Sequence, residues 1–168
     1  EVIRQASIGI LEGKPVDVAD FRQMVDFIRR YADKHHHGKE EVYLFPVMVQ
    51  KLGRIADNLV THGMLVEHDL GRDHVMSLAT ALDEYEKNPK PEYKLDILTE
   101  AMGYARLLKR HVEKENNVVY TFAENQLSKE DLADIDARSK KFEDEETAKG
   151  IQEHYLGMLE ELEKKYIR

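Results

Sequence analysis

The sequence predicts an all-α protein, an up-down-up-down four-helix bundle followed by a C-terminal helical extension. Only 4 prolines and 9 glycines interrupt the 168 residues, and the alternating pattern of strands is rare. Apolar residues instead recur every three or four positions, as they do on one face of a helix. Long helices joined by short breaks favour antiparallel neighbours. We therefore expect the bundle over residues 1–127 and the extension, packed on or beside it, over residues 128–168.

The breaks in the apolar pattern divide the chain into helices. We expect helices at about 1–12, from Asp17 to about 51, at about 57–86, from after 93 to about 125, and one or two more from Ser128 onward. Asp17 and Ser128 carry oxygens that can accept from the free N–H groups of a first helical turn. Pro46 lacks a donor and clashes with the preceding turn, so it should kink or end the regular part of the second helix.

Composition excludes several classes of function. The net charge of -8 argues against nucleic-acid binding, which is driven by release of counterions from phosphates. The chain has no cysteine, so it holds no disulfide, thiolate metal site or cysteine nucleophile. This is compatible with the cytoplasm, the location that we expect. No apolar run approaches the ~20 residues that span a bilayer, so no membrane segment is expected. The oligomeric state is left open.

Polar residues interrupt three apolar stripes at comparable places. They are His36 and Glu40 on the second helix, His68 on the third, and His111 and Glu115 on the fourth. Burying an unpaired carboxylate costs several kcal/mol, so these groups need partners or a metal. A buried hydrogen-bonded network is the plainer alternative. The matching register on three stripes favours a metal.

The second and fourth helices share a local pattern. "HHGKEEVYLF" (36–45) and "HVEKENNVVY" (111–120) both read His-x-x-Lys-Glu. Residues four apart lie on one helical face, so each His-Glu pair can reach the same ion. Three imidazoles and two carboxylates are ligands that suit iron, manganese or zinc. Because each carboxylate can bridge, the pattern indicates two metal ions.

Neighbouring residues receive other interpretations. His37 is left open between a ligand and a donor behind the ligands, and Glu41 is expected to be solvated. Gly71, one turn after His68, leaves room for a small exogenous ligand or permits close helix packing. Tyr104 is interpreted as a packing residue with a polar tip, although a tyrosine beside such a centre could donate to bound oxygen.

These motifs resemble the hemerythrin-like, HHE cation-binding family over most of residues 1–127. Signatures similar to those of its second, third and fourth helices are "HHGKEEVYLF", "LVEHDLGRDH" (65–74) and "HVEKENNVVYTFAENQL" (111–127). The resemblance implies a non-heme di-iron centre, two iron ions with an oxide or hydroxide bridge, in which zinc or manganese can substitute. It implies a protein that binds or senses O2, peroxide or nitric oxide, or handles iron. Whether it is an enzyme is left open; if so, it would be a di-iron oxidoreductase.

The resemblance also implies a ligand set. The family's metal-binding positions match His36, Glu40, His68, His111 and Glu115, with both glutamates as bridges. Two departures make reversible O2 carriage a weaker expectation: Arg72 stands where oxygen carriers have a second histidine, and Glu115 replaces an aspartate one residue further on. Family members also supply a first-helix histidine. Residues 1–11 contain none, so that ligand either lies upstream of Glu1 or is missing from the site.

Other functions compete with this one. The main alternative is a histidine phosphotransfer bundle without metal, because such domains also carry His-x-x-Lys on a helix. That function needs an exposed histidine and has no use for matched glutamates. A ferritin-like enzyme is disfavoured because Glu-x-x-His pairs are absent. A zinc protease is disfavoured because His-Glu-x-x-His is absent.

Overall fold

The computed structural model describes residues 1–167, and in this part of the chain all regular structure is helical, which confirms the predicted all-α class. The α-helices are α1 (Val2–Leu11), α2 (Val18–Phe27), α3 (Phe45–Leu59), α4 (Leu65–Lys87), α5 (Pro91–Lys114), α6 (Tyr120–Gln126), α7 (Lys129–Ala148) and α8 (Ile151–Tyr166). Four π-helical segments continue them: η1 (Ile28–His37), η2 (Glu40–Leu44), η3 (Val60–Met64) and η4 (Glu115–Val119). Within residues 1–167, none of these helices combines the length and apolar character needed to cross a bilayer.

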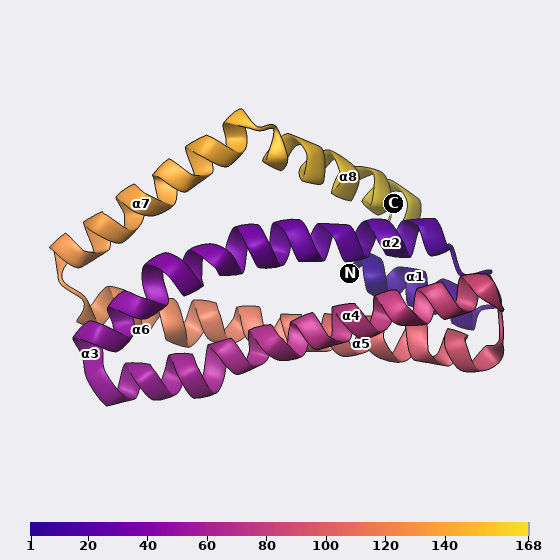
Figure 1. Cartoon of the computed structure of the whole chain (residues 1–168), viewed down its shortest axis with the longest axis horizontal. Helices are drawn as coiled ribbons and strands as arrows, with labels where there is room; N and C mark the ends of the chain where they lie inside the picture. Colours follow the sequence, from indigo (N-terminus) through magenta and orange to yellow (C-terminus); the bar gives the residue numbers. More distant parts are fainter. Residues whose placement is uncertain (168) are drawn as a thin grey trace.

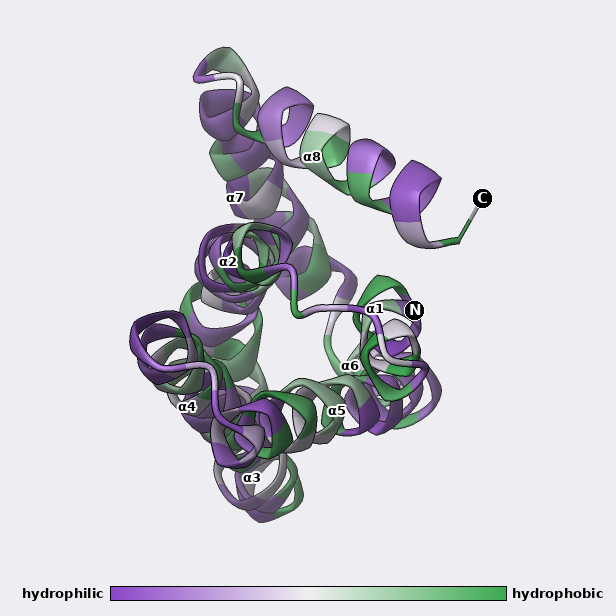
Figure 2. Ribbon diagram, turned by 90° about the vertical axis from the view of Figure 1, so that its right-hand side faces the viewer, coloured by the Kyte–Doolittle hydropathy of each residue, from purple (hydrophilic) through white to green (hydrophobic). Residues whose placement is uncertain are grey.

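The long helices form the bundle that the sequence predicts. Figure 1 shows α4 and α5 side by side along its length, with α2 and its continuation on the opposite side and the shorter α1 beside α5. Viewed end-on in Figure 2, α1, α2, α4 and α5 surround a largely hydrophobic interior. The chain reverses at Gly53, whose φ of 65° suits glycine. The reversal therefore falls a few residues before the predicted start of the third helix at 57.

Apolar side chains fill the two ends of the bundle. One cluster joins α1, α2, α4 and α5 and includes Leu78, Leu82 and Ile97, all fully buried. The other surrounds Met48 and Val119 near the reversal of the chain. Burying each such side chain contributes about 1.5–3 kcal/mol to folding. Along the long helices, the polar residues singled out above lie between these two clusters.

The C-terminal helices lie against the outside of the second helix. Ser128 begins α7 as predicted, because its side chain accepts from the Asp131 N–H. Asp17 likewise caps α2 by accepting from Asp20 N–H. In α8, Tyr155 donates to Asp26 at 3.0 Å. Figure 1 shows α7 and α8 forming an angled pair above α2. The boundary between residues 127 and 128 as a division of domains stays a prediction.

Candidate metal centre

Histidine and glutamate side chains from five helical segments, η1, η2, α4, α5 and η4, converge between the two apolar clusters. Ligand atoms that lie within 4.8 Å of one another are offered by His37, Glu40, His68 and His111. The same limit joins a second, overlapping group: His36, Glu40 and Glu115. Glu40 belongs to both groups. The arrangement therefore has two places where nitrogen and carboxylate oxygen converge, joined by one carboxylate.

Several atoms at this centre lack a hydrogen-bond partner. Among residues 1–167, the buried unpartnered atoms include Glu40 Oε2, His68 Nε2, His111 Nε2 and Glu115 Oε1. His111 Nε2 lies only 2.8 Å from Glu115 Oε1, and His68 Nε2 lies 3.6 Å from Glu40 Oε2. Buried polar atoms are paired as a rule. These atoms belong to the two ligand groups described above, and a cation in each group would satisfy them, so the residues present fit a metal.

Each central histidine is held from behind by a carboxylate. The Nδ1-to-oxygen distances are 3.2 Å for His37 with Asp33, 2.7 Å for His68 with Glu41, and 3.0 Å for His111 with Glu67. A carboxylate that accepts from Nδ1–H assigns the ring proton to that nitrogen and leaves the Nε2 lone pair facing the centre. This is the usual arrangement behind histidines that bind metals. The carboxylates thus prepare three imidazoles as ligands.

Cations on the outer side balance these carboxylates. Arg72 donates from one amino group to Asp33 at 2.8 Å and to Glu41 at 2.7 Å. Lys114 donates to Glu67. Burial alone would raise the pKa of Asp33, but hydrogen bonds from His37 and Arg72 hold that pKa down, at about 2. Asp33 is therefore ionised at neutral pH and able to orient its histidine.

The inner glutamates do not share a single protonation state. Burial, and then the nearby charge of Glu115, raises the pKa of Glu40 to about 8. The Tyr120 hydroxyl donates to Glu40 Oε1, the oxygen that is not among the unpartnered atoms. For Glu115, burial acts to raise the pKa, but the neighbouring His111, Glu40 and His36 together lower it. Without a metal, Glu40 thus holds a proton at neutral pH that a cation would displace.

The π-helical turns explain which of the three consecutive histidines faces the centre. Ile28 and His37 lie nine residues apart, which at about 100° per residue puts them on opposite sides of an α-helix. Residues 28–37 instead form wider π turns, so His37 returns to the buried side with Ile28. His35 is buried on another side, where its ring packs against Phe142 of α7.

The five ligands predicted from the sequence do not all lie on the buried face of the bundle. Four of them, Glu40, His68, His111 and Glu115, are buried together at the centre. The fifth, His36, is exposed as a residue instead of lying on the buried face. It nevertheless offers a ring nitrogen within reach of Glu40 and Glu115. Whether these residues bind metal stays a prediction.

Sequence reasoning missed the carboxylates behind the histidines. Asp33 received no role, and Glu41 was expected to be solvated, yet it bonds to His68. Glu67 was also passed over. A signal existed for Asp33, which stands one helical turn before His37. Glu41 and Glu67 bond to histidines on other helices, so only the packing of the helices could identify them.

Fold and site together define a class of protein: a helical bundle with a histidine–carboxylate cluster between its helices, where such folds hold metal ions. The family described as the hemerythrin HHE cation binding domain matches residues 1–123. The chain belongs to this family. The matched region includes α1 to α5 and contains every residue of the central cluster.

Comparison with curated proteins adds relatives in mycobacteria. The uncharacterized protein Mb2018 of Mycobacterium bovis and the uncharacterized proteins MT2051 and Rv1995 of Mycobacterium tuberculosis are each 28% identical to this chain over 128 residues. The match covers 74% of this chain but 46% of each relative, so the chain spans about half the length of these proteins. No solved structure matched the chain significantly.

Proposed function

We propose that the chain is a non-heme di-iron protein that binds or senses O2 or a related small oxidant, peroxide or nitric oxide, or handles iron itself. The observation that carries the proposal is the set of buried, unpartnered nitrogen and oxygen atoms on His68, His111, Glu40 and Glu115. Membership of a cation-binding family supports it. Neutral imidazole and carboxylate together suit iron, while zinc and manganese remain acceptable substitutes.

The two overlapping groups suggest how two ions would be held. One ion would take His37, His68 and His111 with Glu40, and the other would take His36 and Glu115 with Glu40. Glu40 would therefore bridge. The iron ions would supply the redox chemistry and the affinity for the small ligand.

Side chains around the ions would orient the ligands and exclude water. The carboxylates behind the histidines keep each Nε2 free of a proton. Tyr120 holds the outer oxygen of Glu40. Phe45 and Met64, both buried, belong to the apolar cluster beside the centre, and the Phe45 ring stacks against His68. Such surroundings exclude bulk water and strengthen charge interactions within the site.

Metal analysis tests the proposal. The protein is reconstituted anaerobically with ferrous iron, desalted, and measured for iron content and for visible absorption before and after exposure to air. We expect about two irons per chain and a new absorption band in air. Protein that retains no iron under these conditions would contradict the proposal. One iron per chain would contradict the assignment of Glu40 as a bridge.

A variant pair sharpens the ligand assignment. Glu115→Ala should lose much of the bound iron because it removes a buried carboxylate that faces His111 at 2.8 Å. The matched control is Glu113→Ala, which removes the same charge from an exposed position two residues away. Equal iron content in the two variants would remove Glu115 from the ligand set.

One observation favours the phosphotransfer alternative: His36 is exposed, as that function requires. The surrounding charge opposes it, because the Glu115 carboxylate, whose pKa is lowered, lies within 4.8 Å of the His36 ring nitrogen and would repel a phosphoryl group. Incubation of the metal-free protein with acetyl phosphate, followed by mass spectrometry, separates the two functions. Phosphorylation at His36 would favour the alternative.

A further inference from the structure

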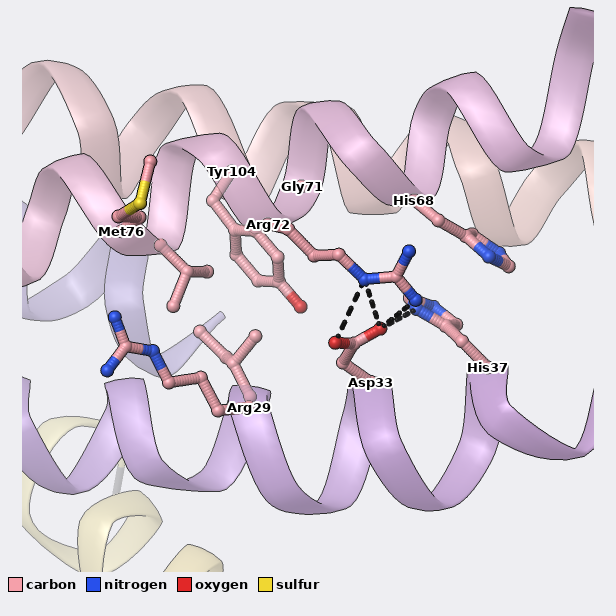
Figure 3. A pocket seen from close by; sticks show the side chains of 10 residues that line it. Arg29, Asp33, His37, His68, Gly71, Arg72, Met76 and Tyr104 are labelled. Carbon is pink, nitrogen blue, oxygen red and sulfur yellow. Dashed lines mark hydrogen bonds and ion pairs between the residues drawn. The ribbon is translucent and has the colours of Figure 1, made fainter. Parts of the chain in front are cut away.

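A cavity of about 260 Å³ lies next to the candidate metal centre, between η1 and α4 (Figure 3). Its walls are mainly apolar and include Ile28, Val75 and Met76. The rings of His37 and His68 form the end towards the centre. The metal function proposed above makes no use of this space.

The hydroxyl of Tyr104, on α5, is the feature of this cavity that packing does not explain. The residue is 5% exposed, and its hydroxyl has no hydrogen-bond partner among residues 1–167. Figure 3 shows the hydroxyl directed into the space between the two helices, beside Asp33. A buried hydroxyl is normally paired. A molecule that accepts a hydrogen bond in the cavity would satisfy this one.

The cavity is much larger than a diatomic gas molecule, which would leave most of it unfilled. A cavity of about 150 Å³ is enough to bind benzene, and a water molecule takes about 30 Å³ in the liquid. A space of about 260 Å³ therefore fits an organic molecule with a ring or a short chain. Gly71 contributes to this room, because a Cβ there would stand 3.7 Å from the Tyr104 ring.

The charges around the cavity favour a neutral ligand that accepts a hydrogen bond and donates none. Burial, and then the charge of Asp33, raises the pKa of Tyr104, so its hydroxyl keeps its proton and can donate. Of the two arginines that line the cavity, Arg72 is already engaged by Asp33, Glu41 and Asp69, and Figure 3 shows the Arg29 guanidinium directed away from Asp33 and the Tyr104 hydroxyl. A carboxylate beside the Tyr104 hydroxyl would face the ionised Asp33. A carbonyl oxygen meets the donor without this repulsion.

We propose that the cavity binds a neutral, mainly apolar carbonyl compound whose oxygen accepts a hydrogen bond from the Tyr104 hydroxyl. The compound would lie over Ile28, Val75 and Met76, with the His37 and His68 rings at one end. This binding site goes beyond the proposed metal function and does not depend on it. Its position beside the centre would place an organic molecule next to the irons if both proposals hold.

Three molecules of similar size provide the test: acetophenone, isopropylbenzene, which lacks the acceptor, and benzoate, which is charged. Binding to the full chain is measured by equilibrium dialysis, before and after removal of metal by a chelator. We expect acetophenone to bind in both preparations and more tightly than the other two. Absence of acetophenone binding would overturn the proposal. So would isopropylbenzene or benzoate binding as tightly as acetophenone.

Variants connect the binding to Tyr104. Tyr104→Phe keeps the ring but should weaken acetophenone binding roughly three- to tenfold, the factor expected for one neutral hydrogen bond. The control is Tyr155→Phe, which removes a hydroxyl from a buried tyrosine that bonds to Asp26 instead. Isopropylbenzene affinity should not change in either variant. An unchanged acetophenone affinity in Tyr104→Phe would overturn the assignment.

A second variant tests the cavity without touching the hydroxyl. Gly71→Leu adds a side chain at a residue that lines the cavity, from a Cβ that would lie 3.7 Å from the Tyr104 ring and 3.9 Å from Leu107. We expect acetophenone binding to fall more than tenfold while the thermal unfolding transition remains cooperative. Undiminished binding by a folded Gly71→Leu protein would show that acetophenone binds elsewhere and would refute the proposed cavity.

Discussion

His68 Nδ1 lies 2.7 Å from a carboxylate oxygen of Glu41, and this contact joins two helices at the candidate metal centre. Glu41 comes from η2 and His68 from α4. Because the carboxylate accepts a hydrogen bond from Nδ1–H, the other ring nitrogen, Nε2, carries the lone pair and lies on the side of Glu40. The orientation of one predicted ligand therefore depends on a residue that the sequence assigned to solvent.

Removal of the Glu41 carboxylate should weaken metal binding without removing a proposed ligand. We expect Glu41→Ala to reduce iron affinity about 10- to 100-fold, the usual effect of losing a group behind a metal-binding histidine. Glu41→Gln should recover part of the loss because its amide oxygen can still accept from Nδ1–H. Affinity is measured by competition with a chromophoric chelator. Glu113→Ala, at an exposed position, serves as the control; an equal loss there would contradict a specific role for Glu41.

Arg72 should act through Asp33 and Glu41 together. It donates to both carboxylates, so Arg72→Gln should weaken iron binding by loosening His37 and His68. Combined with Glu41→Ala, the loss should be smaller than the sum of the single losses, since the two residues share contacts. The same chelator competition measures this coupling. Arg54→Gln, at an exposed position near the chain reversal, is the control. Strict additivity would indicate that Arg72 acts independently of Glu41.

The metal-free protein should lose stability as pH rises above about 7.5. Burial raises the pKa of Glu40 to about 8, so the folded state binds a proton that the unfolded state has released. For His111, burial acts to lower the pKa, but the carboxylates of Glu115, Glu67 and Glu40 together raise it, which gives the same sign. His68, with its pKa lowered to about 4 by burial, is neutral in the folded state, and its unfolded imidazole, with a pKa of about 6.5, has released nearly all of its proton by about pH 7.5, so it adds little above that pH. Each such proton contributes a slope of at most about 1.4 kcal/mol per pH unit.

Urea unfolding of the chelated protein between about pH 7.5 and 9 measures this dependence. Glu40→Gln should flatten the profile, because the amide has no proton to release. Iron affinity should change in the opposite direction and rise with pH, as the metal must displace the Glu40 proton. A wild-type free energy of unfolding that stays constant or increases over this range would contradict the assignment of a protonated Glu40.

Glu143 on α7 should hold the C-terminal extension to the histidine-bearing helix. It accepts from buried His35 at 3.0 Å and from Gln152 at 2.6 Å, and it also pairs with Lys39. Glu143→Ala leaves the His35 ring without its carboxylate, which should cost about 1–3 kcal/mol of unfolding free energy. Hydrogen exchange of α7 should become faster. The control is Glu145→Ala, exposed on the same helix; equal exchange rates in the two variants would argue against the anchor.

Much of the fold follows from local signals. Asp17 and Ser128 were predicted as helix caps, and both side chains accept the expected backbone N–H. Breaks rich in proline and glycine separated the helices because these residues disfavour helical backbone for simple steric reasons. The chain reversal at Gly53 falls within the break expected between about 51 and 57, and a single glycine suffices to make it.

At the candidate site too, some residues follow from the sequence and others only from the packing of the helices. By itself the sequence determined that polar residues interrupt three apolar helical faces, and from this it selected Glu40, His68, His111 and Glu115, which lie together. Tertiary structure alone decided that His37 faces the centre, since a π-helical segment changes the rotation per residue that any regular period assumes. The hydrogen bonds of His68 with Glu41 and of His111 with Glu67 likewise follow only from the tertiary structure. Periodicity describes one helix at a time, whereas these contacts depend on the rotation and axial position of one helix against another.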